Sequence, residues 1–203
     1  IIYGLTAEPT VSFWDSGEYI LSASKLNVGH PPGAPLFQML GAFFSIFAIE
    51  QSQIGFIMNL MSGVASAFTV LFMFWSISIL LSKISSSLKS KTDNYLTILI
   101  SSFIASLSFI FTDTFWFNAV ETEVYAMATL LMSLMFYLAL HWEQDMNKPK
   151  GNKWLILISF IVGMSFGVHF MGLLTIPAIG LIYYFKHYKE ITIKNFIVAN
   201  VVV

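Results

Sequence analysis

Two acidic residues, Asp15 and Glu18, lie three positions apart near the start of a chain in which only 10% of the residues are charged. If Ser12 or Ser16 caps a helix that runs through Leu26, both carboxylates lie in its first turn and face similar directions. One carboxylate could then serve as a base while the other positions it or binds a metal. Acids also complement the helix dipole at N-termini, so a purely structural role carries equal weight.

The segment His30-Pro-Pro-Gly33 follows this pair and predicts a rigid corner. Each proline fixes its own φ and disfavours the α conformation for the residue before it, whereas glycine permits a conformation closed to other residues. His30 is therefore held beside the acid pair and is a candidate for binding a substrate. A structural role, in which its ring bonds the neighbouring backbone, is an equal alternative.

A second acidic pair, Glu121 and Glu123, lies at the mouth of an apolar run, where a charge still costs free energy. Two acids separated by one residue point apart on a helix, so we expect one to face a cavity and the other to cap a helix or meet water. Tyr125, like Trp14 and Trp116, could stack on a sugar ring. Aromatic residues at membrane boundaries are more often interfacial anchors.

An anionic ligand would need positive or donor groups, and Lys25, His30 and His169 are the candidates outside the lysine-rich breaks of the chain. Phosphate recognition usually relies on Arg, which this chain lacks. Either these three groups substitute for Arg, or a part of the protein beyond this chain supplies it. Lys25 has a second interpretation, as a surface lysine whose stem lies along apolar groups.

The composition indicates which elements must position these residues. Hydrophobic residues make up 57% of the chain and the mean hydropathy is +0.76, whereas soluble proteins carry about 25% charged residues. The long apolar runs predict an all-α, polytopic membrane helical bundle, because the strands of a membrane barrel would alternate at every second residue. The net charge of −1 excludes a nucleic-acid partner, and the absence of Cys excludes disulfides and thiolate metal sites.

The two ends of the chain suggest a piece of a longer polypeptide. The chain begins without Met and stops inside an apolar run, and no signal peptide is visible. We therefore expect residues 1–203 to be the N-terminal part of a transmembrane domain, with most of a first span and the C-terminal part missing.

The lysines predict the topology. Nine of the ten lysines fall in three polar breaks of the chain, which the positive-inside rule places in the cytoplasm. These lysines are Lys83, Lys89, Lys91, Lys148, Lys150, Lys153, Lys186, Lys189 and Lys194. The apolar runs 95–112 and 124–142 lie between the first two breaks, and each is about as long as a membrane span. Their connector, 113–123, must then be extracytoplasmic.

Three further apolar runs complete the expected bundle. The run 54–81 is a long span, and the run 154–185 predicts two short or broken helices with a turn near His169. The 14 residues of 36–49 are short for a span and favour an interfacial helix, although a crossing helix would put Asp15 in the cytoplasm. The interfacial interpretation gathers the unusual acids around one extracytoplasmic cavity: Asp15, Glu18, Asp113, Glu121 and Glu123.

Three strings of residues together resemble a known family. They are Phe13-Trp-Asp-Ser-Gly-Glu-Tyr19, Lys25-Leu-Asn-Val-Gly-His-Pro-Pro-Gly-Ala-Pro-Leu-Phe37 and Val120-Glu-Thr-Glu-Val-Tyr125. The family consists of multi-pass membrane proteins, is common in Bacteroidetes, was long labelled only as a domain of unknown function, and includes a vertebrate protein O-mannosyltransferase of the endoplasmic reticulum. The resemblance covers essentially the whole chain.

The resemblance implies a GT-C type glycosyltransferase, whose first extracytoplasmic loop lies flat as short helices and carries an acidic catalytic motif. Such enzymes take a sugar from a polyprenyl-phosphate carrier. The implied partners are that donor, a protein acceptor and membrane lipid, and the implied setting is the bacterial inner membrane with the site facing the periplasm. Mannose is the sugar implied by the vertebrate member.

The resemblance also implies catalytic and binding roles for individual residues, according to their positions in the chain. Asp15 matches the acid expected in the first loop and Glu18 its neighbour, so these two are the catalytic candidates. In an inverting displacement, Asp15 would accept the proton of a Ser or Thr hydroxyl as that oxygen attacks the sugar. The expected substrate-binding residues are Lys25, His30, Glu121, Glu123, Tyr125 and His169. A divalent cation bound by Glu18 or Glu121 is compatible with the sequence but is not required by it.

Two other classes of function compete with a transferase. A transporter also carries acids within the membrane, but usually near mid-bilayer on interrupted helices and with internal repeats, which are not evident here. A noncatalytic membrane scaffold would tolerate replacement of both Asp15 and Glu18.

Overall fold

The computed structural model describes residues 1–87, 95–188 and 192–202, and every regular element in these ranges is a helix. The all-α prediction is therefore confirmed. In chain order the helices are α1 (Ile2–Thr6), α2 (Ser16–Lys25), α3 (Pro35–Ser45), η1 (Gln51–Gln53), α4 (Ile54–Ser87), α5 (Tyr95–Ile110), α6 (Asp113–Val120), α7 (Val124–Asp145), α8 (Lys153–Phe166), η2 (Phe170–Leu174), α9 (Thr175–His187) and α10 (Ile193–Val202). Lys89, Lys91 and Lys189 lie outside the described residues.

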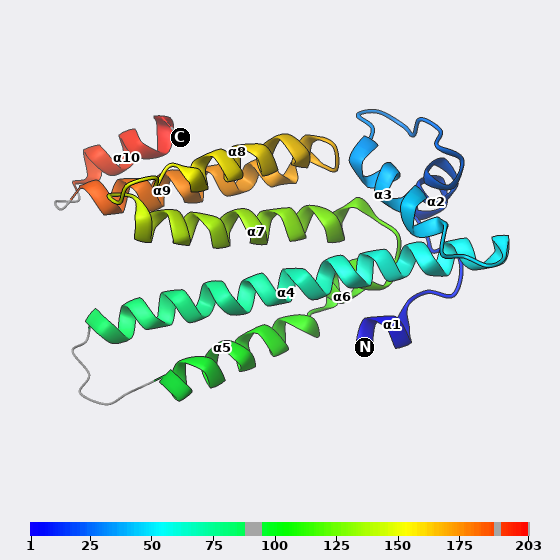
Figure 1. Ribbon diagram of the computed structural model, residues 1–203, viewed down its shortest axis with the longest axis horizontal. Coiled ribbons are helices and arrows are strands. Elements are labelled where there is room, and N and C mark those ends of the chain that lie inside the picture. The colour runs from blue at the N-terminus through cyan, green and yellow to red at the C-terminus, as the bar shows by residue number, and fades with distance from the viewer. Residues whose placement is uncertain (88–94, 189–191, 203) are drawn as a thin grey trace.

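Helices α4 and α7 run side by side through the centre of the molecule, with α5 beside α4 and with α8 and α9 beside α7 (Figure 1). Within the described ranges, two helical stretches are long and apolar enough to cross a membrane: Gln51–Ser87 and Val124–Asp145. The bent pair of α5 and α6 makes a third if it is counted as one broken span. By length and composition, the spans expected at 54–81 and 124–142 are confirmed.

The span expected at 95–112 is shorter than predicted. Helix α5 ends at Ile110, and the chain turns by 68° into α6. Thr112 has extended backbone angles at the start of α6, and Asp113 in its first turn complements the dipole of the new helix. The connector 113–123 is therefore mostly an eight-residue helix and not an open loop.

The run 154–185 is broken as expected. Helix α8 ends at Phe166, His169 is extended, and the short helix η2 leads into α9, which packs against α7 as α8 does. At 14 and 13 residues, α8 and α9 are each shorter than the roughly 20 residues that span hydrocarbon.

The C-terminal ends of α4 and α9, the N-terminal end of α5 and the connection between α7 and α8 lie at one end of the molecule, here called the lysine end (Figure 1). Glu143 ties three helices together there, because its carboxylate pairs with Lys83 of α4 and, at 2.8 Å, with the Nζ of Lys186 of α9. Asp145 pairs with Lys148 at 2.8 Å. Within the described ranges, the lysine grouping inferred from the sequence is thus one end of the bundle.

Helices α1, α2 and α3 and the turn at η2 lie at the opposite end (Figure 1). Helix α3 is docked through its first turn, since the backbone N–H groups of Leu36 and Phe37 donate to the carbonyl oxygen of Gly167 at 2.8 and 3.3 Å. A Cβ on Gly167 would lie 2.9 Å from the Cβ of Leu36, so only glycine permits this approach. The first loop is thereby attached to the turn that carries His169.

Candidate active site

A cavity of about 480 Å³ opens at the end opposite the lysines. Its walls come from the N-terminal loop and α2, the His30 corner, α6 with the segment that follows it, and the turn before η2. The lining residues are Trp14, Asp15, Tyr19, His30, Pro32, Thr114, Phe117, Asn118, Glu121, Glu123, Val124, Tyr125 and His169. Six of the eight residues predicted to be catalytic or substrate-binding therefore meet at one cavity, and Glu18 and Lys25 are the two of these eight that do not line it.

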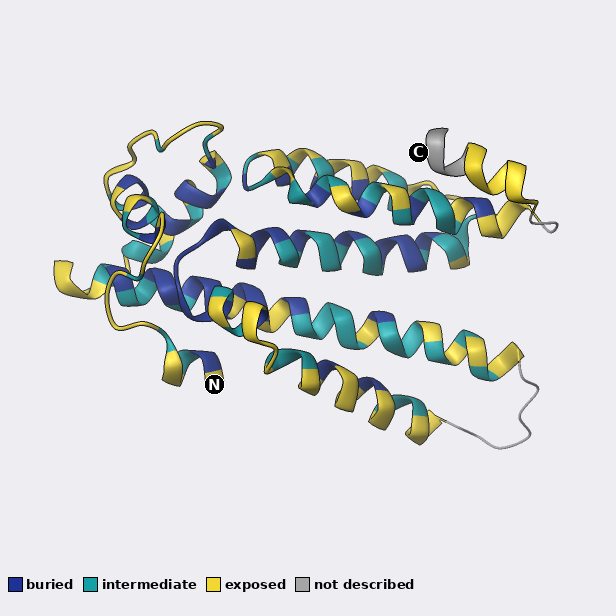
Figure 2. Ribbon diagram, turned by 180° about the vertical axis from the view of Figure 1, so that it is seen from behind, coloured by how far each residue is buried: buried dark blue, intermediate teal, exposed yellow. Residues whose placement is uncertain are grey.

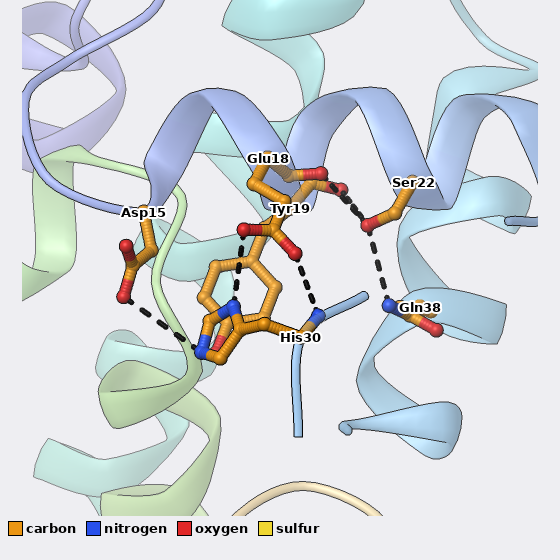
Figure 3. A network of polar contacts seen from close by, with 6 residues as sticks. All are labelled: Asp15, Glu18, Tyr19, Ser22, His30 and Gln38. Carbon is orange, nitrogen blue, oxygen red and sulfur yellow. Dashed lines mark hydrogen bonds and ion pairs between the residues drawn. The ribbon is translucent and has the colours of Figure 1, made fainter. Parts of the chain in front are cut away.

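Asp15, Glu18 and His30 form a connected group at one wall of the cavity (Figure 3). The Glu18 carboxylate accepts the backbone N–H of His30 at 2.6 Å and faces its Nδ1 at 3.1 Å. The other ring nitrogen, Nε2, lies 3.9 Å from Oδ2 of Asp15. The hydrogen bond from the His30 backbone, followed by that from its ring, holds the pKa of Glu18 below its ordinary value, so Glu18 stays ionised as an anchor for His30.

The start of α2 differs from the expectation. Asp15 itself is the N-cap residue, and neither Ser12 nor Ser16 caps the helix through its side chain. Ser12 instead donates its hydroxyl to Oε2 of Glu121 at 2.6 Å. The Asp15 side chain, which is 60% exposed, is left directed at the cavity and His30.

The segment 30–33 is the tight corner that its sequence predicts. The backbone N–H of Gly33 donates to the carbonyl oxygen of His30 at 2.9 Å, the Pro31–Pro32 peptide is cis, and Gly33 has a φ of +79°. The left-handed φ is one that glycine adopts without a steric cost. The corner presents the His30 ring to both acids of α2.

Gly29 permits the close approach of this corner to α2. A Cβ on Gly29 would lie 2.7 Å from Nε2 of Gln38 and 3.4 Å from Oε1 of Glu18. We expect Gly29→Ala to push His30 away from Glu18 and to lower the free energy of unfolding by about 1–2 kcal/mol. Chemical or thermal unfolding of the full-length protein in nanodiscs measures the effect.

The matched control is Gly163→Ala. Gly163 is an exposed position inside α8, and a Cβ there meets no atom within 4 Å. The same change should be neutral or stabilise by about 1 kcal/mol, because alanine is the better helix former. Equal destabilisation by both variants would contradict the role given to Gly29.

The second acidic pair is arranged by an extended backbone. Glu121 and Glu123 have φ and ψ of −128°, 164° and −140°, 154°, and successive side chains of extended chain point to opposite sides. Both acids therefore line the cavity, and the expectation that only one would do so is wrong. The segment is buried between α6 and α7 (Figure 2), with Glu121 only 2% and Glu123 only 6% exposed.

Thr122 points the other way and fixes the segment to α4. Its hydroxyl donates to Oδ1 of the fully buried Asn59 at 2.6 Å. The Asn59 amide donates in turn to the carbonyl oxygens of Glu8 and Thr10, at 2.7 and 2.9 Å. One asparagine thus holds the N-terminal loop and the Glu121 segment in fixed register beneath the cavity.

Burial and mutual repulsion act on these acids. Burial raises the pKa of Glu121, although the hydroxyl of Ser12 opposes the shift. Burial, followed by the negative charges of Glu121 and Asp15, raises the pKa of Glu123 to about 7, against hydrogen bonds from the backbone N–H groups of Val124 and Asp15. Near neutral pH, Glu123 therefore exists in both protonation states and its protonated form can donate a hydrogen bond.

Two further groups can donate into the cavity. Burial, with the charges of Glu123 and Asp15, raises the pKa of Tyr19 to about 12, so its hydroxyl keeps its proton. Nδ1 of His169 accepts the backbone N–H of Met171 at 3.1 Å, which assigns the proton of the neutral ring to Nε2. The His169 ring lies 5.3 Å from that of Tyr125.

Some residues singled out from the sequence lie elsewhere. Lys25 is an exposed residue of the last turn of α2 and does not line the cavity. Trp116 packs against Tyr3 and stacks on Phe111 instead of facing the cavity. Among residues 1–87, 95–188 and 192–202, no group of three or more His, Cys, Asp or Glu side chains is arranged to hold a metal ion.

The sequence interpretation missed the contribution of α6. Thr114, Phe117 and Asn118 line the cavity together with Glu121, and these four residues follow the i, i+3, i+4, i+7 spacing of one helix face. This spacing in the sequence could have predicted that the four side chains face the same side. Tyr19, four residues after Asp15, was visible by the same rule.

Comparison with known proteins assigns the chain to a family. Residues 15–192 match the family described as the protein O-mannosyl-transferase TMEM260 N-terminal domain. The protein O-mannosyl-transferase tmem260 of Dictyostelium discoideum is 27% identical over 150 residues, which cover 71% of this chain and 16% of that protein. The protein O-mannosyl-transferase TMEM260 of Mus musculus is 24% identical over 164 residues, which cover 81% of this chain and 21% of that protein.

No solved structure matches the chain. The chain spans about a fifth or less of the length of these two relatives. The matched region begins at Asp15, includes the Glu121 segment and His169, and continues past the end of α9, so it includes every predicted site residue. The chain therefore belongs to the family of the protein O-mannosyl-transferase TMEM260 N-terminal domain.

Proposed function

We propose that this chain forms the sugar-transfer site of a membrane glycosyltransferase, which moves mannose from a polyprenyl-phosphate carrier to a Ser or Thr hydroxyl of a protein. The names of the relatives, both protein O-mannosyl-transferases, support the reaction class. The observation that carries the proposal is the Asp15 carboxylate at the mouth of the cavity, 3.9 Å from a histidine that Glu18 anchors.

Asp15 is proposed as the base. As the acceptor oxygen attacks the anomeric carbon, a bond forms between them, the bond from that carbon to the phosphate oxygen breaks, and the hydroxyl proton passes to Asp15. The lipid phosphate leaves with the electron pair, and the configuration of the sugar inverts. Asp15 suits this role better than Glu18, because both oxygens of Glu18 are engaged by His30.

Glu18 is proposed as a positioning residue and His30 as the group it positions. With Nδ1 facing Glu18, the Nε2 atom of His30 is directed at Asp15. The Nε2 edge of the His30 ring can also approach the phosphate of the donor. Nε2–H of His169 is proposed as a second donor to that phosphate.

The remaining walls suit a sugar. Trp14, Tyr19, Phe117 and Tyr125 offer aromatic faces and edges to the C–H side of a pyranose ring. Glu121 and Glu123 offer oxygens to its hydroxyl groups, and the partly protonated Glu123 can both donate and accept. A pocket of apolar walls with a few convergent polar groups is typical of small-molecule sites.

The wider setting is part of the same proposal. The short helices α2 and α3 beside the site support a GT-C-like arrangement in which they lie at the membrane interface, with residues 1–203 as an N-terminal part of that domain. The lysines at the opposite end support a site on the extracytoplasmic face. We propose the bacterial inner membrane as the location, with the cavity facing the periplasm.

The test uses the full-length protein in proteoliposomes with an acceptor peptide and radiolabelled mannose, supplied either as polyprenyl-phosphate mannose or as a nucleotide sugar. We expect labelled peptide only with the lipid-linked donor. A transporter would move solute across the vesicle without labelling the peptide, and a scaffold would do neither. Labelling from the nucleotide sugar alone would overturn the choice of donor.

A further inference from the structure

A second groove, of about 500 Å³, lies between α4 and α7 near the lysine end. It is separate from the site described above, because it shares no lining residue with the first cavity. Its lining residues are Trp75, Ser78, Ile79, Ser82, Lys83 and Ser86 of α4 and Tyr137, His141 and Gln144 of α7.

The lining of the groove changes from apolar to polar along the helices. At one end the aromatic rings of Trp75 and Tyr137 lie 5.5 Å apart and form an apolar floor with Ile79. At the other end Lys83 and Gln144 supply N–H donors, whereas the Ser86 hydroxyl donates to the backbone carbonyl oxygens of Ser82 and Lys83. Eight residues separate Trp75 from Lys83, which is about 12 Å along a helix axis. The groove thus has an apolar half and a polar, cationic half, as an amphipathic ligand requires.

The polar half has an excess of positive charge. Glu143 pairs with both Lys83 and Lys186, and the neighbouring Asp145 pairs with Lys148 and Lys153. In this part of the described chain, four lysines thus share two carboxylates. An ammonium group has three N–H donors, so Lys83 can bond a second anion without leaving Glu143.

We propose that this groove binds an anionic phospholipid from the leaflet at the lysine end. The phosphate lies against Lys83 and Gln144, and the upper part of an acyl chain lies on Trp75, Ile79 and Tyr137. Two features on the same groove favour this occupant: the graded polarity of its lining and the charge complementarity between a lysine excess and an anionic leaflet. The inference is independent of the sugar-transfer proposal.

Fluorescence quenching tests the inference. The full-length protein is placed in phosphatidylcholine nanodiscs that contain a low, matched fraction of lipid brominated on the acyl chain, either phosphatidylglycerol or phosphatidylcholine. The signal of Trp75 is the difference between the wild type and Trp75→Phe. We expect brominated phosphatidylglycerol to quench this signal several-fold more strongly than brominated phosphatidylcholine.

Three variants sharpen the test. Lys83→Gln should lower the preference for phosphatidylglycerol by about fivefold. Ser82→Leu fills the groove without touching the ion pairs and should abolish the preference, which keeps the test valid if Lys83→Gln fails to fold. Lys150→Gln removes an equal charge from an exposed position outside the groove and should change little.

Equal quenching by the two lipids would identify ordinary surrounding lipid and overturn the inference. Absence of quenching by either lipid would mean that another part of the full-length protein covers the groove, and would overturn it as well. An effect of Lys150→Gln as large as that of Lys83→Gln would show that general surface charge, not this groove, sets the preference.

Discussion

Asp15→Asn should lower the rate of sugar transfer by the full-length protein about 10²–10⁴-fold, because a positioned general base contributes that much to a proton-transfer step. Asparagine keeps the shape of the side chain and leaves the backbone N–H of residue 15 able to bond Glu123. The Glu18 anchor of His30 is also untouched. The loss should therefore appear in kcat, measured with saturating polyprenyl-phosphate mannose and acceptor peptide, while expression and thermal stability are retained.

The matched control for this variant is Asp113→Asn. Asp113 is an exposed acid in the first turn of α6 and does not line the cavity, so the same isosteric change there should leave kcat within about twofold. Wild-type turnover by Asp15→Asn would remove Asp15 from the role of base. A loss that is equal in both variants would point to surface charge and not to proton transfer.

The helices were the predictable part of this protein. Runs such as 54–81 and 124–142 are apolar over whole membrane-spanning lengths, so their composition alone indicates α4 and α7. The glycines of the run 154–185 and the position of His169 likewise indicated a break. The bend after Ile110 was harder to predict. It depends on the extended backbone at Thr112 and on the packing of α6 against Tyr3, and no local sequence pattern indicates either feature.

The geometry of the site was harder to predict than the residues that form it. From the sequence, Asp15, His30 and Glu123 could be identified as candidate site residues, because polar residues are unusual in such an apolar chain. It could not show that three extended residues aim two glutamates into one cavity, because a period-2 pattern over three positions is too short to distinguish from a loop. Asn59 was invisible for a similar reason, since its partners lie 49 to 63 residues away along the chain.

The same distinction separates Glu18 from Asp15. Both are acids at the start of one helix, and sequence spacing treats them alike. They differ only in the folded structure. The corner at 30–33 brings His30 into hydrogen-bond contact with the Glu18 carboxylate, whereas the Asp15 carboxylate remains accessible from the cavity. The roles of neighbouring acids are thus set by which one a distant backbone N–H reaches.

Glu123→Gln should make the full-length protein more stable at alkaline pH. The pKa of Glu123 is about 7 in the folded chain and 4.5 as the ordinary value, so the unfolded chain loses this proton first as pH rises. The stability that the protonated group contributes is complete below pH 4.5 and is lost as pH rises to about 7. The shift corresponds to a loss of up to about 3 kcal/mol.

Thermal unfolding in nanodiscs at about pH 4.5 and about pH 8.5, on either side of this window, measures the difference. The glutamine of the variant cannot ionise, so Glu123→Gln should match the wild type at the lower pH and unfold at a clearly higher temperature at the higher pH. Asp113→Asn, at an exposed acid of the same end that does not line the cavity, should leave the pH dependence of the wild type unchanged. A stability difference that is the same at both pH values would mean that the glutamine packs better, and that the buried charge of Glu123 is not what destabilises the protein.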